Sequence, residues 1–190
     1  MNTITKTKIN KIKWTSADLE LLPENNRYEI IEGELYMTRA PHWKHQDTIG
    51  IIYSLLQNWS QQTKLGKAII NPGIIFSDTD NVIPDLVWIS QERLDISVDN
   101  SGHLINAPEL IIEVLSQSQN DRRRDRENKL KLYSNRGVEE YWIVDWKLKQ
   151  VEIYRRNEGK LELKLTLLNN DEITSSLLPN FSCNINRFFD

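Results

Sequence analysis

Cysteine is almost absent from this sequence, which contains Cys183 alone among 190 residues. One cysteine excludes an intrachain disulfide bond and a cysteine-based zinc site, and it fits a reducing compartment. Long apolar runs are also missing, so no segment is suited to cross a bilayer. Residues 1–13 are polar and lysine-rich and lack the apolar stretch of a signal peptide. We therefore expect a cytoplasmic protein without a membrane partner.

The motifs of several common enzyme classes are missing as well. There is no GxGxxG or Walker sequence for a nucleotide, and no organic cofactor is expected. His42, His45 and His103 lack the close spacing of a zinc-binding motif such as HExxH, and Ser116 lacks the surroundings of a nucleophile elbow. The sequence therefore gives no indication of nucleotide chemistry or of serine-based hydrolysis.

The net charge of −3 argues against a protein that coats nucleic acid without specificity, because such proteins are usually basic. It does not exclude a nuclease, since an acidic metal site lowers the net charge. Basic residues nevertheless gather in two places. They are Lys6, Lys8, Lys11 and Lys13 near the start, and Arg122, Arg123, Arg124, Arg126, Lys129 and Lys131 further along.

The order of local patterns predicts one α/β domain over residues 14–190, preceded by a flexible arm over residues 1–13. A short helix is expected from Ser16, as its cap, to Leu22, with Pro23 ending it. A hairpin is expected around Glu32–Gly33, and a long helix over 45–64 with Gly66 as its stop. The later elements are predicted strands at 67–76, 82–89, 109–115, 140–145, 150–156 and 160–168, and a helix at 121–135. The last two strands are expected to form a second hairpin that turns at Asn157–Gly159. This order predicts a mixed central sheet flanked by helices.

Glu113 is the misfit in an otherwise apolar strand, 109–115. A buried carboxylate costs several kcal/mol if nothing compensates its charge. A metal ion would compensate it. An exposed position at the end of the strand, with an arginine as partner, would also explain it, and spacing alone leaves both interpretations open.

Asp85 is a second acidic residue beside an apolar run, between Pro84 and Leu86. It can cap a turn. Two carboxylates on two apolar strands are, however, what a Mg²⁺ site requires, because Mg²⁺ takes oxygen ligands and needs only one or two carboxylates when a substrate supplies phosphate oxygens. Asp85 and Glu113 are therefore the candidate metal ligands.

The charged helix 121–135 places Asp125 and Lys129 four residues apart, on one face. On a solvated helix such a pair contributes only about 0.2–0.5 kcal/mol. Because the helix closely follows Glu113, Lys129 can alternatively reach a metal-bound water or a phosphate. Of the tryptophans, Trp59 and Trp142 are expected in the core, and Trp14, Trp43 and Trp146 at the surface or an interface. The sequence gives no reason to assign base stacking to any of them.

Three segments resemble the Uma-type family of proposed restriction endonucleases, which is common in cyanobacteria and was long described as a domain of unknown function. The segments are Pro108 to Ser116, Asp125 to Tyr133, and Gly137 to Asp145. Upstream, Tyr28-Glu29, Gly33-Glu34-Leu35, His45 and Pro84-Asp85-Leu86 are also similar to that family. The similarity extends over residues 19–156.

The resemblance implies a PD-(D/E)XK, restriction-endonuclease-like fold and the hydrolysis of DNA phosphodiester bonds with Mg²⁺, for which Mn²⁺ can substitute. Asp85 and Glu113 would bind the metal, with help from the carbonyl of Val114. The usual lysine lies two residues after the glutamate, where this sequence has Leu115. The family's lysine on the next helix matches Lys129, which would assist the attacking water.

The resemblance also gives Asp125 the task of positioning Lys129. It adds Glu34 and His45 as accessory positions, as a further acid and as a contact to phosphate or metal-bound water. A homodimer is expected, because nucleases of this fold often pair to cut both strands. Two alternatives remain: a catalytically silent DNA-binding or regulatory protein on the same fold, and a structural module in which Asp85 and Glu113 merely cap turns.

Overall fold

A six-stranded mixed sheet forms the centre of the protein, with the strand order β10-β9-β8-β7-β6-β3. The computed structural model describes residues 12–23, 26–38 and 40–189. The strands are β3 (Gly66–Ile70), β6 (Leu86–Ser90), β7 (Leu110–Val114), β8 (Glu140–Asp145), β9 (Gln150–Asn157) and β10 (Lys160–Leu168). β7 and β8 are parallel, and the other neighbouring pairs are antiparallel. The predicted fold class, a mixed sheet flanked by helices, is confirmed.

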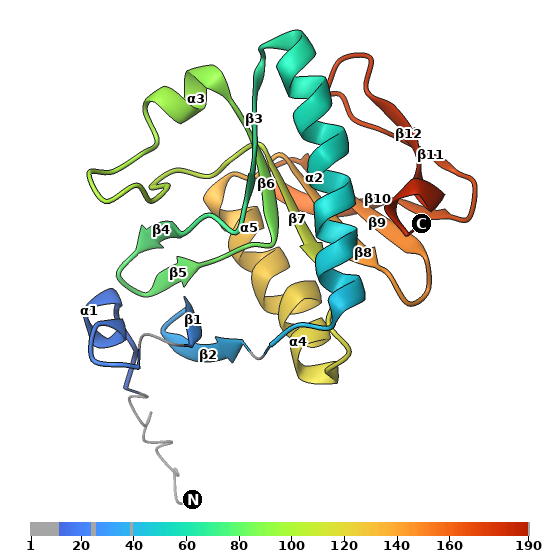
Figure 1. Cartoon of the computed structure of the whole chain (residues 1–190). Helices are drawn as coiled ribbons and strands as arrows, with labels where there is room; N and C mark the ends of the chain where they lie inside the picture. The colour runs from blue at the N-terminus through green and yellow to red at the C-terminus, as the bar shows by residue number, and fades with distance from the viewer. Residues whose placement is uncertain (1–11, 24–25, 39, 190) are drawn as a thin grey trace, which may run out of the picture.

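Helix α2 (Trp43–Thr63) lies along one face of this sheet (Figure 1). Its apolar residues Ile52 and Leu56 belong to a core that includes Leu86 and Ile112 from the sheet. The C-terminal β11 (Glu172–Thr174), β12 (Ser182–Asn184) and η2 (Ile185–Phe188) contribute to the same core. No helix in the parts of the chain described is both long and apolar enough for a membrane span.

The opposite face is covered by the chain that connects the parallel strands β7 and β8. It contains α4 (Gln119–Arg123), the π-helical turn η1 (Arg124–Lys129) and α5 (Leu130–Arg136). A second sheet, with the order β2-β1-β5-β4, adds to the core on this side. Its strands are β1 (Arg27–Ile31), β2 (Glu34–Thr38), β4 (Ile74–Ser77) and β5 (Asp80–Val82). The short helices α1 (Ser16–Leu19) and α3 (Gln91–Asp95) complete the fold.

Both predicted hairpins are confirmed. Glu32 and Gly33 have φ of 53° and 80°, and Glu158 and Gly159 have φ of 47° and 84°. Positive φ at both turn residues matches the twist of the flanking strands, and glycine adopts it without steric cost. Local sequence therefore determines these two connections.

Two predicted strands are each divided between the two sheets. The segment 67–76 forms β3 and β4, with a break at Asn71, whose φ is 49°. The segment 82–89 begins in β5 and ends in β6, so residues 83–85 pass from one sheet to the other. β-rich composition predicts extended backbone but does not say which sheet a residue joins.

Three details of the predicted helices are wrong: the cap and the end of the first helix, and the residue that stops the long one. Thr15, not Ser16, precedes α1, and its amide and hydroxyl both donate to the Asp18 carboxylate at 2.8 Å; the helix stops at Leu19. Helix α2 ends with Lys64 in the left-handed conformation, φ 59°, while Gly66 already belongs to β3. Most of the predicted arm 1–13 lies outside the described residues.

Candidate active site

Asp85 lies beside Glu113 because of the register between β6 and β7. Leu86 pairs with Ile112, and one further step in this antiparallel register sets Asp85 opposite Glu113. The Asp85 carboxylate takes part in this contact, since its Oδ2 accepts a hydrogen bond of 2.8 Å from the Val114 amide. The Asp85 amide approaches Oε2 of Glu113 at 3.4 Å. Two acids far apart in sequence are thus held at one end of the sheet.

Both carboxylates lie on the face of the sheet covered by η1 and α5. Side chains alternate along a strand, so Glu113 shares a face with Ile111, and Ile111 packs in one core with Leu132 of α5. The side chain of Glu113 is buried, with the residue only 3% exposed. The interpretation of Glu113 as an exposed strand end paired with an arginine is therefore wrong.

Lys129 supplies the positive charge next to Glu113. Its Nζ lies 2.8 Å from Oε1 of Glu113, 2.9 Å from Oε1 of Glu29 and 4.0 Å from Oδ1 of Asp125. The residue is 1% exposed, so the solvated ion pair between Asp125 and Lys129 is also a wrong interpretation. The helix brings a buried ammonium to the two strands, as its position after Glu113 indicated.

The π-helical turn η1 explains how one short segment directs three charged side chains inward. Arg124, Asp125 and Lys129 are all buried within it. In an α-helix Arg124 and Lys129, five residues apart, would point about 140° away from each other. A turn closed by i→i+5 hydrogen bonds brings them to the same side. Residues 121–136 contain no proline or glycine, so nothing in the local sequence marks this irregularity.

Glu29 is the residue that the sequence argument did not select. It is buried on β1, and besides Lys129 its Oε1 accepts a hydrogen bond of 2.8 Å from the Ile83 amide. The sequence pattern that selected Glu113, a carboxylate next to apolar strand residues, was also present here, because Glu29 directly precedes the apolar pair Ile30-Ile31. A carboxylate next to such a run needs a partner, and here that partner comes from η1.

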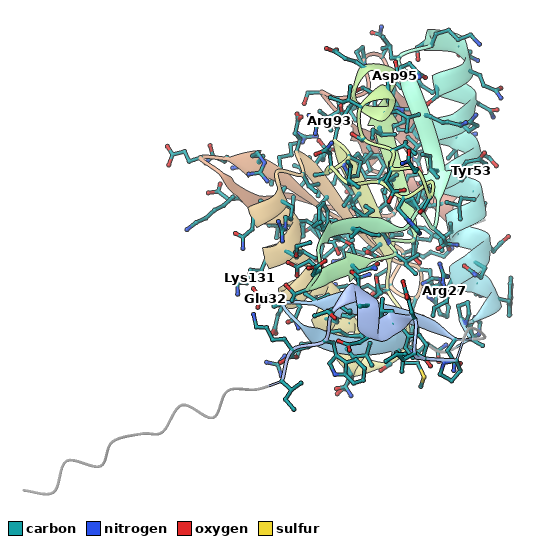
Figure 2. All side chains as sticks on the ribbon, turned by 90° about the vertical axis from the view of Figure 1, so that its left-hand side faces the viewer. Arg27, Glu32, Tyr53, Arg93, Asp95 and Lys131 are labelled. Carbon is teal, nitrogen blue, oxygen red and sulfur yellow. The ribbon has the colours of Figure 1, made fainter. Side chains whose placement is uncertain are left out.

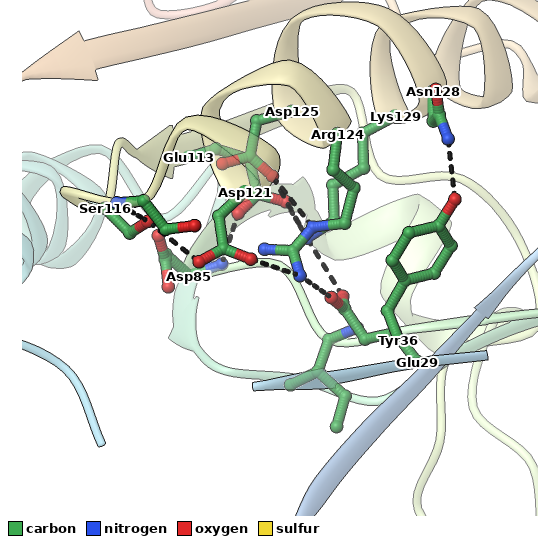
Figure 3. A network of polar contacts seen from close by, with 12 residues as sticks. Glu29, Tyr36, Asp85, Glu113, Ser116, Asp121, Arg124, Asp125, Asn128 and Lys129 are labelled. Atoms are coloured by element: carbon green, nitrogen blue, oxygen red, sulfur yellow. Dashed lines mark hydrogen bonds and ion pairs between the residues drawn. The ribbon is translucent and has the colours of Figure 1, made fainter. Parts of the chain in front are cut away.

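Arg124 is the second cation of the cluster. Its guanidinium lies 3.3 Å from Oδ1 of Asp125, 3.5 Å from Oδ1 of Asp121 and 3.7 Å from Oε2 of Glu29. Figure 3 shows this side chain between Asp121 and Glu29, with Lys129 behind it on the same helical segment. Arg124 therefore links η1 to the small sheet.

Of the two accessory positions, the structure brings His45 to the acids and leaves Glu34 apart. His45, near the start of α2, has its Nε2 3.4 Å from Oδ2 of Asp85, and its Nδ1 is buried with no hydrogen-bond partner among the described residues. Glu34 is exposed on β2 and accepts a hydrogen bond of 3.0 Å from Tyr36. It is not among the residues that line the cleft described next.

These groups meet in a cleft of about 390 Å³. Its wall includes Glu29, His45, Asp85, Glu113, Asp125 and Lys129. The cleft lies where β1, the start of α2, the ends of β6 and β7, and η1 approach one another. All four catalytic residues named from the sequence, Asp85, Glu113, Asp125 and Lys129, line this one cavity, which a structural module with isolated turn caps does not predict.

A family model described as "Uma2: Putative restriction endonuclease" matches residues 16–186. The chain belongs to the Uma2 family. Its fold is similar to the crystal structure of a "putative nuclease belonging to DUF820" from Anabaena variabilis ATCC 29413. The TM-score is 0.72 at 22% sequence identity, over 92% of this chain and 97% of that chain. No curated protein matches the chain. The family resemblance noted in the sequence is confirmed.

Burial dominates the protonation of Glu113 in this Uma2 cleft. Desolvation raises the pKa of its carboxyl from 4.5 to about 8, although the ammonium of Lys129 acts in the opposite direction. Burial also opposes ionisation of Asp85, but the hydrogen bond and charge of His45, followed by the charge of Lys129, lower the pKa of Asp85. The two neighbouring acids therefore differ, with Asp85 the one that ionises first.

Lys129 stays protonated in this setting. Burial alone would lower its pKa, but the carboxylates of Glu113, Glu29 and Asp125 outweigh that effect and raise the pKa of the ammonium. His45 is a second base in the cleft. Burial lowers the pKa of its imidazole, but the hydrogen bond and the charge of Asp85 outweigh burial and raise that pKa. The cleft therefore presents a fixed cation and not a neutral amine.

The charge balance of the Uma2 cleft fits a divalent metal. Glu29, Asp85, Glu113 and Asp125 face two permanent cations, so the cluster retains excess negative charge or protons. In the described part of the chain, no three His, Cys, Asp or Glu side chains are grouped to hold a metal by themselves. A metal would then need oxygens from water or substrate, which is typical of Mg²⁺ and not of Zn²⁺.

The contacts of Glu113 and Asp85 gather on one oxygen of each carboxylate. Oε1 of Glu113 already accepts hydrogen bonds of 2.8 Å from Lys129 and Tyr133, and Oδ2 of Asp85 contacts Val114 and His45. Oδ1 of Asp85 and Oε2 of Glu113 are the second oxygens of the two carboxylates. Of these two oxygens, Oε2 of Glu113 also accepts the hydrogen bond of 3.4 Å from the Asp85 amide.

The raised pKa of Glu113 predicts a pH-dependent stability. Between pH 4.5 and about 8 the folded protein keeps a proton on Glu113 that the unfolded chain has lost. The free energy of unfolding of the metal-free protein should therefore fall across this window, by an amount on the order of a few kcal/mol, and level off above it. The variant Glu113→Gln should show a smaller decrease, because only the raised pKa values of Asp125 and His45 then remain. Urea denaturation from pH 4 to 9 measures it.

The exposed Glu127 on the same helical segment provides the control, because Glu127→Gln should keep the wild-type slope. Equal slopes for wild type and Glu113→Gln would contradict the assignment of this proton to Glu113.

Proposed function

We propose that this protein is a metal-dependent endonuclease that hydrolyses DNA phosphodiester bonds. One observation supports this above all: Asp85, Glu113 and the ammonium of Lys129 meet in a single cleft. Two acids with a lysine beside them form the set of groups expected for phosphodiester hydrolysis with Mg²⁺. Membership of a family described as restriction endonucleases agrees with it.

Asp85 and Glu113 would hold Mg²⁺, with Mn²⁺ as a substitute, together with the Val114 carbonyl. Bound there, the ion would lower the pKa of a water ligand and neutralise charge on the phosphate. Asp85 is suited to this because its lowered pKa keeps it ionised. Glu113 would lose its proton when it contributes to the site, which favours cleavage at neutral to alkaline pH.

Lys129 would act as a hydrogen-bond donor and not as a base. Its raised pKa keeps the proton on Nζ, so it can orient the attacking water or stabilise a phosphate oxygen, but it cannot accept a proton. Glu29 and Asp125 would position it from two sides, at 2.9 Å and 4.0 Å. His45 would orient Asp85 or contact a metal-bound water.

Nicking of supercoiled plasmid tests the proposal. Wild-type protein should convert supercoiled into open-circular and linear DNA with Mg²⁺ or Mn²⁺, and should show no conversion in EDTA. Readdition of metal to the EDTA sample should restore the rate. Mn²⁺ binding by calorimetry, without DNA, gives a second readout that does not depend on turnover.

Protein that binds DNA but leaves the plasmid intact with every divalent ion would contradict the nuclease proposal and favour the catalytically silent alternative. Equal nicking in EDTA would contradict metal dependence. The homodimer and the cytoplasmic location stay predictions from the fold type and the cysteine content.

A further inference from the structure

Three aromatic rings are stacked beside the cleft. The rings of His42 and Trp146 have centroids 4.9 Å apart and an interplanar angle of 20°. The rings of His42 and Trp43 are 6.0 Å apart at 27°. His42 and Trp146 line the cleft, and Trp43 is 66% exposed. We call Trp43, His42 and Trp146 the ring stack.

Hydrogen bonds hold the ring stack in place. Trp146 donates from Nε1 to the carbonyl of Leu115 at 3.1 Å, two residues after Glu113. His42 caps α2, and its Nδ1 accepts from the amide of Lys44 at 3.1 Å. The stack is therefore fixed to the same strand and helix that carry Glu113 and His45. Trp146 directly follows β8 and His42 directly precedes α2, so both rings lie next to regular elements.

The Trp43 ring of the stack is exposed to solvent, and the ammonium of Lys44 lies over this ring. Nζ of Lys44 lies 5.5 Å from the centre of the Trp43 ring. An exposed tryptophan that continues a stack toward solvent buries little of its own surface, so its position contributes little to folding. A flat ring next to a cation matches a nucleobase with its phosphate, because every base has a π-face and base–aromatic stacking tolerates any sequence.

The charge of the cleft makes such a contact important. The acids that line the cleft, which are Glu29, Asp85, Glu113, Asp121 and Asp125, outnumber the cations Arg27, Arg124 and Lys129 even when Glu113 carries a proton. Phosphates alone are therefore poorly attracted there before a metal binds. Stacking does not depend on charge, so it can hold the nucleic acid beside an acidic site.

We infer that the ring stack binds an unpaired nucleobase next to the scissile phosphate. This rests on the proposed function and specifies its substrate class: DNA with a single-stranded, frayed or branched segment, in preference to an intact duplex. Bases within a duplex have their faces covered by their neighbours and cannot stack on a side chain without being flipped out. The stack therefore selects DNA whose bases are already accessible.

Fluorescence anisotropy in EDTA tests this inference, with a labelled single strand, a forked duplex and a blunt duplex of equal length. Trp43→Ala should weaken binding to the single strand and the fork by about tenfold, and Trp43→Phe should keep most of the affinity. The blunt duplex should bind more weakly to wild type and respond little to the substitution. Trp14→Ala, an exposed tryptophan that does not line the cleft, is the matched control.

The salt dependence separates stacking from a phosphate contact. Loss of stacking should leave the slope of log affinity against log salt unchanged, since no counterion release is lost. A changed slope, an equal loss on single strand and duplex, or no loss at all would overturn the inference. Because the assay contains no metal and no turnover, a failed nicking assay with these binding results would count against the proposed function alone.

Discussion

Replacing Lys129 by methionine is expected to lower the free energy of unfolding by about 3–5 kcal/mol. The substitution keeps much of the side-chain volume but removes the ammonium that lies between Glu113 and Glu29. The carboxyl groups of Glu29, Glu113 and Asp125 would then face one another in the core, with Arg124 as the remaining cation of the cluster. Removing one partner of a buried ion pair is costly because the other charge stays buried. Chemical denaturation at pH 7 measures the loss.

Lys131, two residues further along, is the matched control. Its ion pair with Glu32 lies on the outside of the molecule, where Figure 2 shows the two side chains together. Exposed pairs of this kind contribute about 0–1 kcal/mol, so Lys131→Met should change stability little. A similar effect for both lysines would contradict the special role of the buried cluster.

A double variant connects this effect to Glu113. At pH 9, where the Glu113 carboxyl is ionised in the wild type, adding Glu113→Gln to Lys129→Met should recover part of the lost stability, because the carboxylate is removed together with its cation. Independent, additive losses would mean that the two side chains do not act as a pair in the folded protein.

Replacing Asp85 by asparagine is expected to lower the rate of metal-dependent nicking by about 10³-fold. A bound metal supplies several kcal/mol of transition-state stabilisation, and each 1.36 kcal/mol corresponds to a factor of ten. Asparagine keeps an oxygen that can accept the hydrogen bond from Val114, so the end of the sheet should stay intact. Plasmid nicking at saturating Mn²⁺ gives the rate, and calorimetry gives the accompanying loss of Mn²⁺ affinity.

The substitution has a further consequence for Glu113. The charge of Asp85 helps to raise the pKa of Glu113, so Asp85→Asn should lower the pKa of Glu113. Asp47→Asn, an exposed position on α2, is the control for nicking and for metal binding. Wild-type nicking by Asp85→Asn in a correctly folded protein would remove Asp85 from the catalytic set.

Much of the candidate site was predictable from local sequence, because a charged residue in an apolar strand is unfavourable unless it has a partner. That argument selected Glu113 and Asp85, and the charged helix after Glu113 selected Asp125 and Lys129. The same argument applied to Glu29, but the resemblance directed attention to Glu34 on the neighbouring strand. Both acids lie in one hairpin, and only the packing of that hairpin against η1 distinguishes the buried acid from the exposed one.

By itself, the sequence determined the elements whose geometry depends on neighbouring residues: the glycine turns at Gly33 and Gly159, the long helix α2, and the apolar strand around Glu113. The tertiary structure alone decided the division of two strands between two sheets, the π-helical turn η1, and the stack of Trp146 on His42. These features arise from contacts between segments distant in sequence. Their free energy comes from burial and from charge pairing, and neither can be read from a short window of residues.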